Sequence, residues 1–168
     1  VTPHHLFLST DDFPRLGVKG KMNPPLRSKS QQEALFQAFL MGDIPIIATD
    51  HAPHALEEKN SLELSGVPGL ETCLPLLLNY CRPLDLYRLK LIISALAINP
   101  RRLMRLPEKG SIAENTPANL TVIDLKKTKT IRDEDLKTRC KWSPWEGEEL
   151  QGWPVLTMNQ GRITYNDL

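Results

Sequence analysis

Hydrophobic and polar positions follow two different patterns along the chain, with a change near residue 108. Before it, short apolar runs alternate with stretches of helical periodicity, which is typical of a parallel α/β layer. After residue 110, short runs of alternating character predict β-strands. We therefore expect an α/β fold with a small β appendage, divided into residues 1–108 and 109–168.

Two strands are predicted in the first part. Val1–Ser9 has the character of a short strand leading into a loop, with Pro3 limiting its hydrogen bonding. Ile44–Thr49 (IPIIAT) is apolar at both sets of alternating positions. A strand of that composition is buried on both faces, as in a parallel sheet.

Three helices are predicted in the same part. The first begins at Ser30, which forms a capping box with Glu33, and ends at the glycine cap Gly42. The second covers Leu70–Tyr80. The third covers Asp85–Ile98 and stops at Asn99-Pro100, and its predicted buried residues are Leu86, Leu89, Ile92, Ile93 and Leu96.

The β-rich part contains two predicted strand regions. They are Asn119–Leu125 and Pro154–Tyr165. The second is expected to fold into a hairpin at Asn159-Gln160-Gly161, because asparagine and glycine tolerate the left-handed conformations of tight turns. Trp142 and Trp145, which precede it, are expected to pack this appendage against the rest of the chain.

The charge balance excludes several classes of protein. Lysine and arginine number 21 against 20 aspartate and glutamate residues, so the net charge is +1 and nucleic acid is not an expected partner. No apolar run approaches the ~20 residues of a membrane-spanning helix, and the first residues do not show the basic flank and apolar core expected of a signal peptide. The three cysteines form no CxxC pair, which favours reduced thiols and packing roles for Cys73 and Cys81. We expect a soluble, cytoplasmic protein without a membrane partner.

The segment Ile44–His54 (IPIIATDHAPH) contains the most informative polar residues. Asp50 follows a predicted buried strand, at the carboxyl end where α/β barrels keep their catalytic residues. Pro53 interrupts regular structure, so His54 can return over the same strand end. An acid and a histidine there predict a catalytic pair. The alternatives are that Asp50 caps the next turn and that His54 bonds to backbone.

Other polar residues favour structural interpretations. His4 and His5 are adjacent on a predicted strand and point to opposite faces, so at most one could bind a metal ion in a barrel. We interpret both as structural. A small basic loop, containing Lys19, Lys21, Arg27 and Lys29, is interpreted as solvated surface.

Several motifs together carry a family resemblance. They are TDHAPH at Thr49–His54, EEK at Glu57–Lys59, GLET at Gly69–Thr72, TPHHLFLS at Thr2–Ser9, NPPLR at Asn23–Arg27, NPRR at Asn99–Arg102 and SPWEG at Ser143–Gly147. In this order they resemble class I dihydroorotase, a zinc amidohydrolase of pyrimidine biosynthesis. The resemblance covers nearly the whole chain, and DHAPH is its most specific part.

The resemblance implies roles for individual residues. Asp50 would lie at the end of the eighth strand of a (β/α)8 TIM-type barrel, bind a zinc ion and act as general base and acid. His54 would hold the carboxylate of the substrate. The loops at Asn23 and at Ser65-Gly66 would contact the pyrimidine ring through backbone groups.

The resemblance also implies that other zinc ligands lie outside this chain. The chain would begin at the seventh barrel strand and hold the last two barrel strands with their helices. We expect the C-terminal part of an enzyme that interconverts N-carbamoyl-L-aspartate and L-dihydroorotate, inactive without the missing N-terminal half of the barrel. The alternative is a non-catalytic chain that scaffolds a partner such as aspartate carbamoyltransferase. A homo-oligomer is a further possible assembly.

Overall fold

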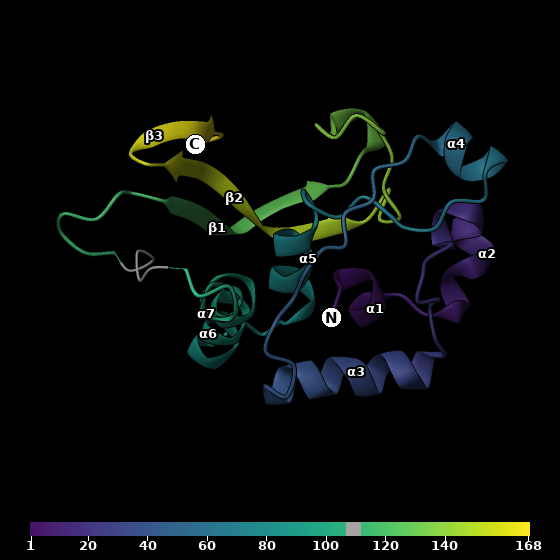
Figure 1. Cartoon of the computed structure of the whole chain (residues 1–168), viewed down its shortest axis with the longest axis horizontal. Helices are drawn as coiled ribbons and strands as arrows, with labels where there is room; N and C mark the ends of the chain where they lie inside the picture. Colours follow the sequence, from purple (N-terminus) through teal and green to yellow (C-terminus); the bar gives the residue numbers. More distant parts are fainter. Residues whose placement is uncertain (107–111) are drawn as a thin grey trace.

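The computed structural model describes residues 1–106 and 112–168 of an α/β chain. Helices occupy the first range and a sheet follows in the second (Figure 1). The elements are α1 (Pro3–Phe7), α2 (Phe13–Leu16), α3 (Lys29–Met41), α4 (Leu56–Ser61), α5 (Cys73–Tyr80), α6 (Leu86–Ile93), α7 (Asn99–Leu103), β1 (Leu120–Thr130), β2 (Glu149–Asn159) and β3 (Arg162–Asn166). The expected domain boundary near residue 108 lies outside the described residues.

Helix α5 lies between the sheet and α3 and contacts two apolar cores (Figure 1). Leu76 belongs to one core, and Leu77 and Leu78 belong to the other. Strand β2 packs closely on this helix at Gly152, where a Cβ atom would lie 2.8 Å from the Cβ atom of Leu78. Gly152 also has a φ of +105°, so both space and backbone conformation require glycine.

The two tryptophans join the second range to the first, as predicted. Trp142 and Trp145 are 1% and 2% exposed and share a core with Leu8 and Leu16. The packing roles expected for the cysteines are also confirmed, because Cys73 and Cys81 are buried in the other core.

The sheet is antiparallel with the strand order β1-β2-β3. The predicted hairpin is confirmed, and its turn contains Gln160 and Gly161 with φ values of +49° and +80°. Strand β1 continues beyond the predicted end at Leu125, although its register is irregular between Asp124 and Thr128. Residues 126–130 are all polar, so an alternating apolar and polar pattern does not predict a strand there.

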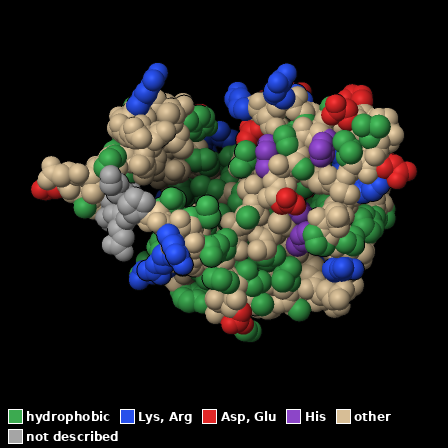
Figure 2. Space-filling model, in the orientation of Figure 1, with side chains coloured by type: hydrophobic (Ala, Val, Ile, Leu, Met, Phe, Trp, Pro, Cys, Tyr) green, Lys and Arg blue, Asp and Glu red, His purple; other side chains and the backbone are tan. Residues whose placement is uncertain are grey.

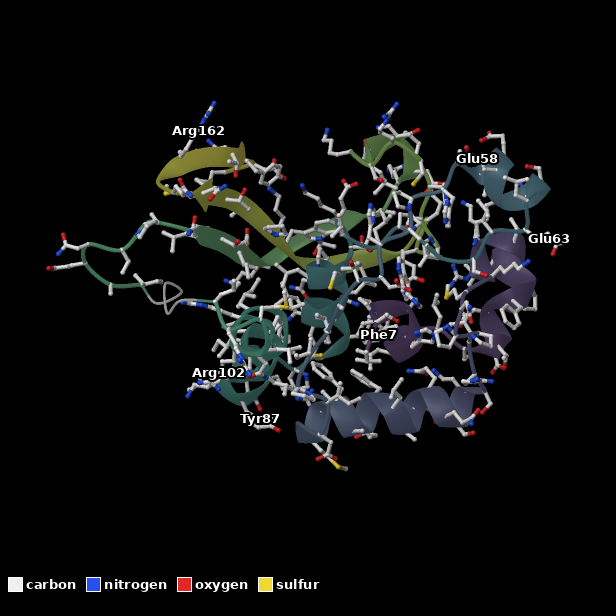
Figure 3. All side chains as sticks on the ribbon, viewed as in Figure 1. Phe7, Glu58, Glu63, Tyr87, Arg102 and Arg162 are labelled. Carbon is white, nitrogen blue, oxygen red and sulfur yellow. The ribbon has the colours of Figure 1, made fainter. Side chains whose placement is uncertain are left out.

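The strand predicted at Val1–Ser9 is wrong, because these residues form α1. The Thr2 side chain caps the helix by accepting from the backbone N–H of His5, and Pro3 occupies the first turn, where no N–H donor is needed. Extended pairing persists only at Val1, whose carbonyl accepts from Ala48 N–H at 2.9 Å. The side chain of Phe7, the last residue of α1, is labelled in Figure 3. Its ring stacks on that of Tyr80 at 4.7 Å between ring centroids.

Residues 44–49 are extended but are not assigned to a strand. Ile47 is buried, whereas Ala48 is exposed, so the prediction of burial on both faces is wrong. The Ile47 side chain packs into the core that contains Leu77 and Ile92. The backbone of the segment pairs with Val1 and with the carbonyl of Ala95. Parallel pairing does occur just beyond, between His51 and Val67.

The predicted helices exist, but several of their ends differ. Helix α3 begins at Lys29, because Ser28 rather than Ser30 is the N-cap and its capping-box partner is Gln31. The glycine cap at Gly42 is confirmed, with a φ of +88°. The second predicted helix, α5, begins three residues later than expected, at Cys73.

The predicted stop at Asn99-Pro100 is also wrong. A π-helical turn at Ser94–Ile98 leads directly into α7, and Pro100 lies in the first turn of that helix, where proline is tolerated. Ile92 is buried as predicted, whereas Leu86 and Ile93 are 67% and 52% exposed. Across residues 1–106 and 112–168, no helix has the length and apolar character needed to cross a membrane.

Stability should depend on pH through the buried side chain of His4. Burial, assisted by the charge of His5, lowers the pKa of His4 to about 3. Between pH 6.5 and that value the unfolded chain binds a proton that the folded chain does not, so the free energy of unfolding should fall as pH falls. Urea unfolding should show a slope of up to about 1.4 kcal/mol per pH unit that His4→Gln removes. An unchanged slope in the variant would contradict this role.

Candidate functional site

Asp50 lies where the extended segment 44–49 ends. Its backbone is left-handed, with a φ of +49°, and the residue is exposed. Within the described ranges its carboxylate has no hydrogen-bond or ion-pair partner. The alternative in which Asp50 caps the next turn therefore finds no support, and the carboxylate is free to contact a ligand.

His51 organises the loop that runs beside this segment. Its Nδ1 atom accepts from the backbone N–H groups of Gly69 and Leu70, at 3.0 and 3.4 Å. Ala52 N–H also donates to the carbonyl of Val67 at 3.0 Å. Hydrogen bonds thus join the DHAPH motif to the GLET motif. The sequence does not predict this linking role for His51.

His54 is half-buried and is held by its backbone. Its N–H donates to the carbonyl of Ala52 at 3.0 Å, and its carbonyl accepts from the indole Nε1 of Trp142 at 2.8 Å. No hydrogen bond of its ring occurs among the described residues, so the alternative of a ring bonded to backbone finds no support. Figure 2 shows histidine side chains reaching one face of the molecule, with an acidic side chain among them.

Ser65 and Gly66 lie against the same segment. Gly66 has a φ of +108°, and a Cβ atom on it would lie 2.5 Å from the Cβ atom of Ala52. Its N–H donates to the carbonyl of Lys21 at 3.0 Å. This contact brings the Ser65-Gly66 loop to the Asn23 loop, so the predicted site residues lie on adjoining segments.

The loop at Asn23 is fixed by His5. The His5 Nε2 atom lies 2.8 Å from the carbonyl oxygen of Pro24, and its Nδ1 atom lies 2.6 Å from the Thr2 hydroxyl. Both ring nitrogens are thereby engaged, which supports the structural interpretation of His5. Asn23 itself is exposed and precedes a cis peptide bond to Pro24.

Lys59, the last residue of the EEK motif, has a structural role that the sequence does not predict. It is fully buried, and its Nζ atom donates to the carbonyls of Lys21, Leu64 and Gly66 at 2.8, 3.0 and 2.8 Å. Burial and the nearby charge of Lys21 lower the pKa of Lys59 to about 8. At neutral pH the amine therefore keeps the three protons that these bonds use.

The basic loop is largely neutralised, in agreement with its interpretation as solvated surface. Lys19 pairs with Asp133 at 3.1 Å and Lys21 pairs with Glu63 at 3.0 Å. These lysines therefore offer little free charge to an anion.

The described residues do not form a complete metal site. Residues 1–106 and 112–168 contain no cluster of three or more histidine, cysteine, aspartate or glutamate residues suited to a metal ion. The free carboxylate of Asp50 fits the role of one ligand, whereas a catalytic zinc ion usually has three protein ligands. A metal ion at Asp50 would need further ligands.

Comparison with known proteins identifies the family. The amidohydrolase family model matches residues 7–164. The chain belongs to the amidohydrolase family. This amidohydrolase chain is 42% identical over 170 residues to a dihydroorotase of Listeria innocua and 41% identical over 172 residues to one of Carboxydothermus hydrogenoformans. The alignments cover 99% and 100% of the chain but 40% of each relative, so the chain spans about 40% of the length of these curated relatives.

Solved structures of hydantoinases share the fold of this chain. The L-hydantoinase of Arthrobacter aurescens matches with a TM-score of 0.89 and 29% identity, over 99% of this chain and 38% of that one. The D-hydantoinase of a Thermus species matches with a TM-score of 0.86 and 29% identity, over 98% of this chain and 38% of that one.

Substitution of Gly66 should test the contact between the two loops of the site. Gly66→Ala introduces both backbone strain and a clash with Ala52, so we expect a loss of about 2–4 kcal/mol in unfolding free energy. Gly161→Ala is the matched control, because Gly161 also has a positive φ but nothing within 4 Å of its Cβ position. Its loss should stay near 1 kcal/mol. Equal losses in urea unfolding would show that the contact at Ala52 is unimportant.

Proposed function

We propose that the chain is the C-terminal part of a dihydroorotase, which interconverts N-carbamoyl-L-aspartate and L-dihydroorotate in pyrimidine biosynthesis. The observation that carries the proposal is the unpaired Asp50 carboxylate within TDHAPH, next to the ordered loop of the GLET motif. The identity of 41–42% to dihydroorotases along the whole chain supports this reaction over that of the 29% identical hydantoinases.

In this proposal residues 1–106 supply the last two strands and helices of a TIM-type barrel. The parallel bridge at His51 and the pairing of Val1 with Ala48 support parallel strands here. Large apolar side chains on α6 and after it are also exposed, including Leu86 at 67% and Leu103 at 70%. Such a surface is suited to packing against further barrel elements.

The proposed reaction assigns proton transfer to Asp50. A zinc ion bound there with further ligands would supply hydroxide near neutral pH, because zinc lowers the pKa of bound water to ~7. Asp50 accepts the proton released as the ring amide is attacked and returns it to the leaving nitrogen. Its freedom from other partners leaves the carboxylate available for both steps.

The remaining site residues recognise the substrate. His54 donates a hydrogen bond to the ring carboxylate, and the indole N–H of Trp142 anchors its backbone. Backbone groups at Asn23, Ser65 and Gly66 contact the pyrimidine ring. We assign a cytoplasmic location to this enzyme. We also propose that it assembles as a homo-oligomer or in a complex with aspartate carbamoyltransferase.

Substrate preference tests the proposed reaction. The test uses a chimaera in which this chain replaces the matching 170 residues of the Listeria innocua dihydroorotase. The remaining part of the chimaera comes from that enzyme. It should hydrolyse dihydroorotate far better than dihydrouracil, which lacks only the carboxylate, because unpaired donors in the site cost about 1–3 kcal/mol each. The measurement is kcat/KM on both substrates with chimaera whose folding has been checked by circular dichroism.

The histidine at position 54 provides the internal control. His54→Ala should lower kcat/KM for dihydroorotate but not for dihydrouracil. The ratio of the two kcat/KM values should therefore decrease. Comparable efficiencies on both substrates in the unsubstituted chimaera would contradict the dihydroorotase assignment and favour a broader cyclic-imide hydrolase.

Asp50→Asn should abolish most turnover while leaving the fold intact. Asparagine matches the shape of aspartate but cannot accept the proton, so kcat should fall by about a hundredfold or more. Steady-state kinetics and thermal unfolding of the chimaera give both quantities. Retention of more than about a tenth of the turnover, a barrier change below ~1.4 kcal/mol, would exclude Asp50 as the base.

A further inference from the structure

Lys59 is the most completely buried charged side chain among the described residues, with an exposure of 0%. Burying a charge is unfavourable unless it is paired and hydrogen-bonded. All three donors of the ammonium are used on backbone carbonyls. The ammonium therefore holds these three carbonyl groups close to one another.

The three carbonyls belong to the loops of the proposed substrate site. Lys21 lies two residues before Asn23, and Leu64 and Gly66 lie on either side of Ser65. One ammonium therefore fixes both loops at the residues that flank the predicted ring contacts.

The acidic residues nearby do not compete for this ammonium. Glu58 accepts from the backbone N–H of Ala55, and Glu63 pairs with Lys21 at 3.0 Å. Both glutamates point outward around α4 (Figure 3). Within the described residues no carboxylate forms an ion pair with Lys59, and its hydrogen bonds all go to backbone carbonyls.

Lys59 is also linked to His54 through a tryptophan. Its Nζ atom lies 5.8 Å from the centroid of the Trp142 ring, within the range of a cation–π contact. The indole N–H of the same ring donates to the carbonyl of His54. The ammonium thus holds the two loops, and the indole holds the His54 backbone.

We propose that Lys59 is a positioning residue for substrate binding, which holds the Lys21–Asn23 and Leu64–Gly66 backbones in the geometry that receives the pyrimidine ring. The proposal rests on the proposed function. Lys59 does not contact the reacting atoms in this scheme. Without Lys59, ordering the two loops when the substrate binds costs more free energy. KM for dihydroorotate therefore rises while kcat changes little.

The test compares three variants in the chimaera. Lys59→Met keeps the aliphatic stem without donors, and Lys59→Gln keeps two donors on a shorter side chain. Lys126→Met is the control, because Lys126 is an exposed lysine in β1. We expect KM to rise about tenfold in Lys59→Met and less in Lys59→Gln, with kcat within about twofold and Lys126→Met unchanged.

Amide hydrogen exchange provides a readout that does not depend on activity. Peptides covering residues 19–24 and 62–67 should exchange faster in Lys59→Met, whereas the α6 peptide 86–93 should not change. If the unsubstituted chimaera lacks dihydroorotase activity, the proposed function fails, and exchange still decides whether Lys59 holds the loops. Unchanged KM and exchange in a folded variant would overturn the proposal, as would loss of folding in both Lys59 variants.

Discussion

The close approach of the 64–70 loop to the 50–54 segment is the contact on which the candidate site depends. Gly66 meets Ala52 without room for a side chain, and the His51 ring accepts from the backbone of the same loop. The hydrogen bonds and the close contact all involve backbone of the 64–70 loop, so they hold the two segments together. Asp50 is exposed at one end of the 50–54 segment, and half-buried His54 is the last residue of that segment.

The β appendage contributes directly to this arrangement. Trp142 donates to the backbone of His54 from within the core that joins the two described ranges. Glu71 of the GLET motif accepts from the backbone N–H groups of Lys137 and Thr138, both at 2.8 Å. The appendage therefore supports the site loops as well as covering apolar surface.

Features encoded by neighbouring residues could be predicted from the sequence. The Gly42 cap and the turn at Gln160-Gly161 need only local backbone conformations, and the predicted packing of the two tryptophans agrees with their burial. The position of Asp50 directly after an apolar run makes it a candidate from the sequence alone. The roles of His51 and Lys59 could not be predicted, because their partners are backbone groups up to 38 residues away that leave no trace in residue identity.

We propose that Asp50 and His54 contact the same carboxylated ring substrate. A crystal structure of the metal-loaded, Asp50→Asn chimaera with dihydroorotate tests it most directly. The account predicts residue 50 beside the scissile amide and the His54 ring about 3 Å from the ring carboxylate, within hydrogen-bond distance. Dihydroorotate bound away from either residue, or with its carboxylate directed away from His54, would contradict it.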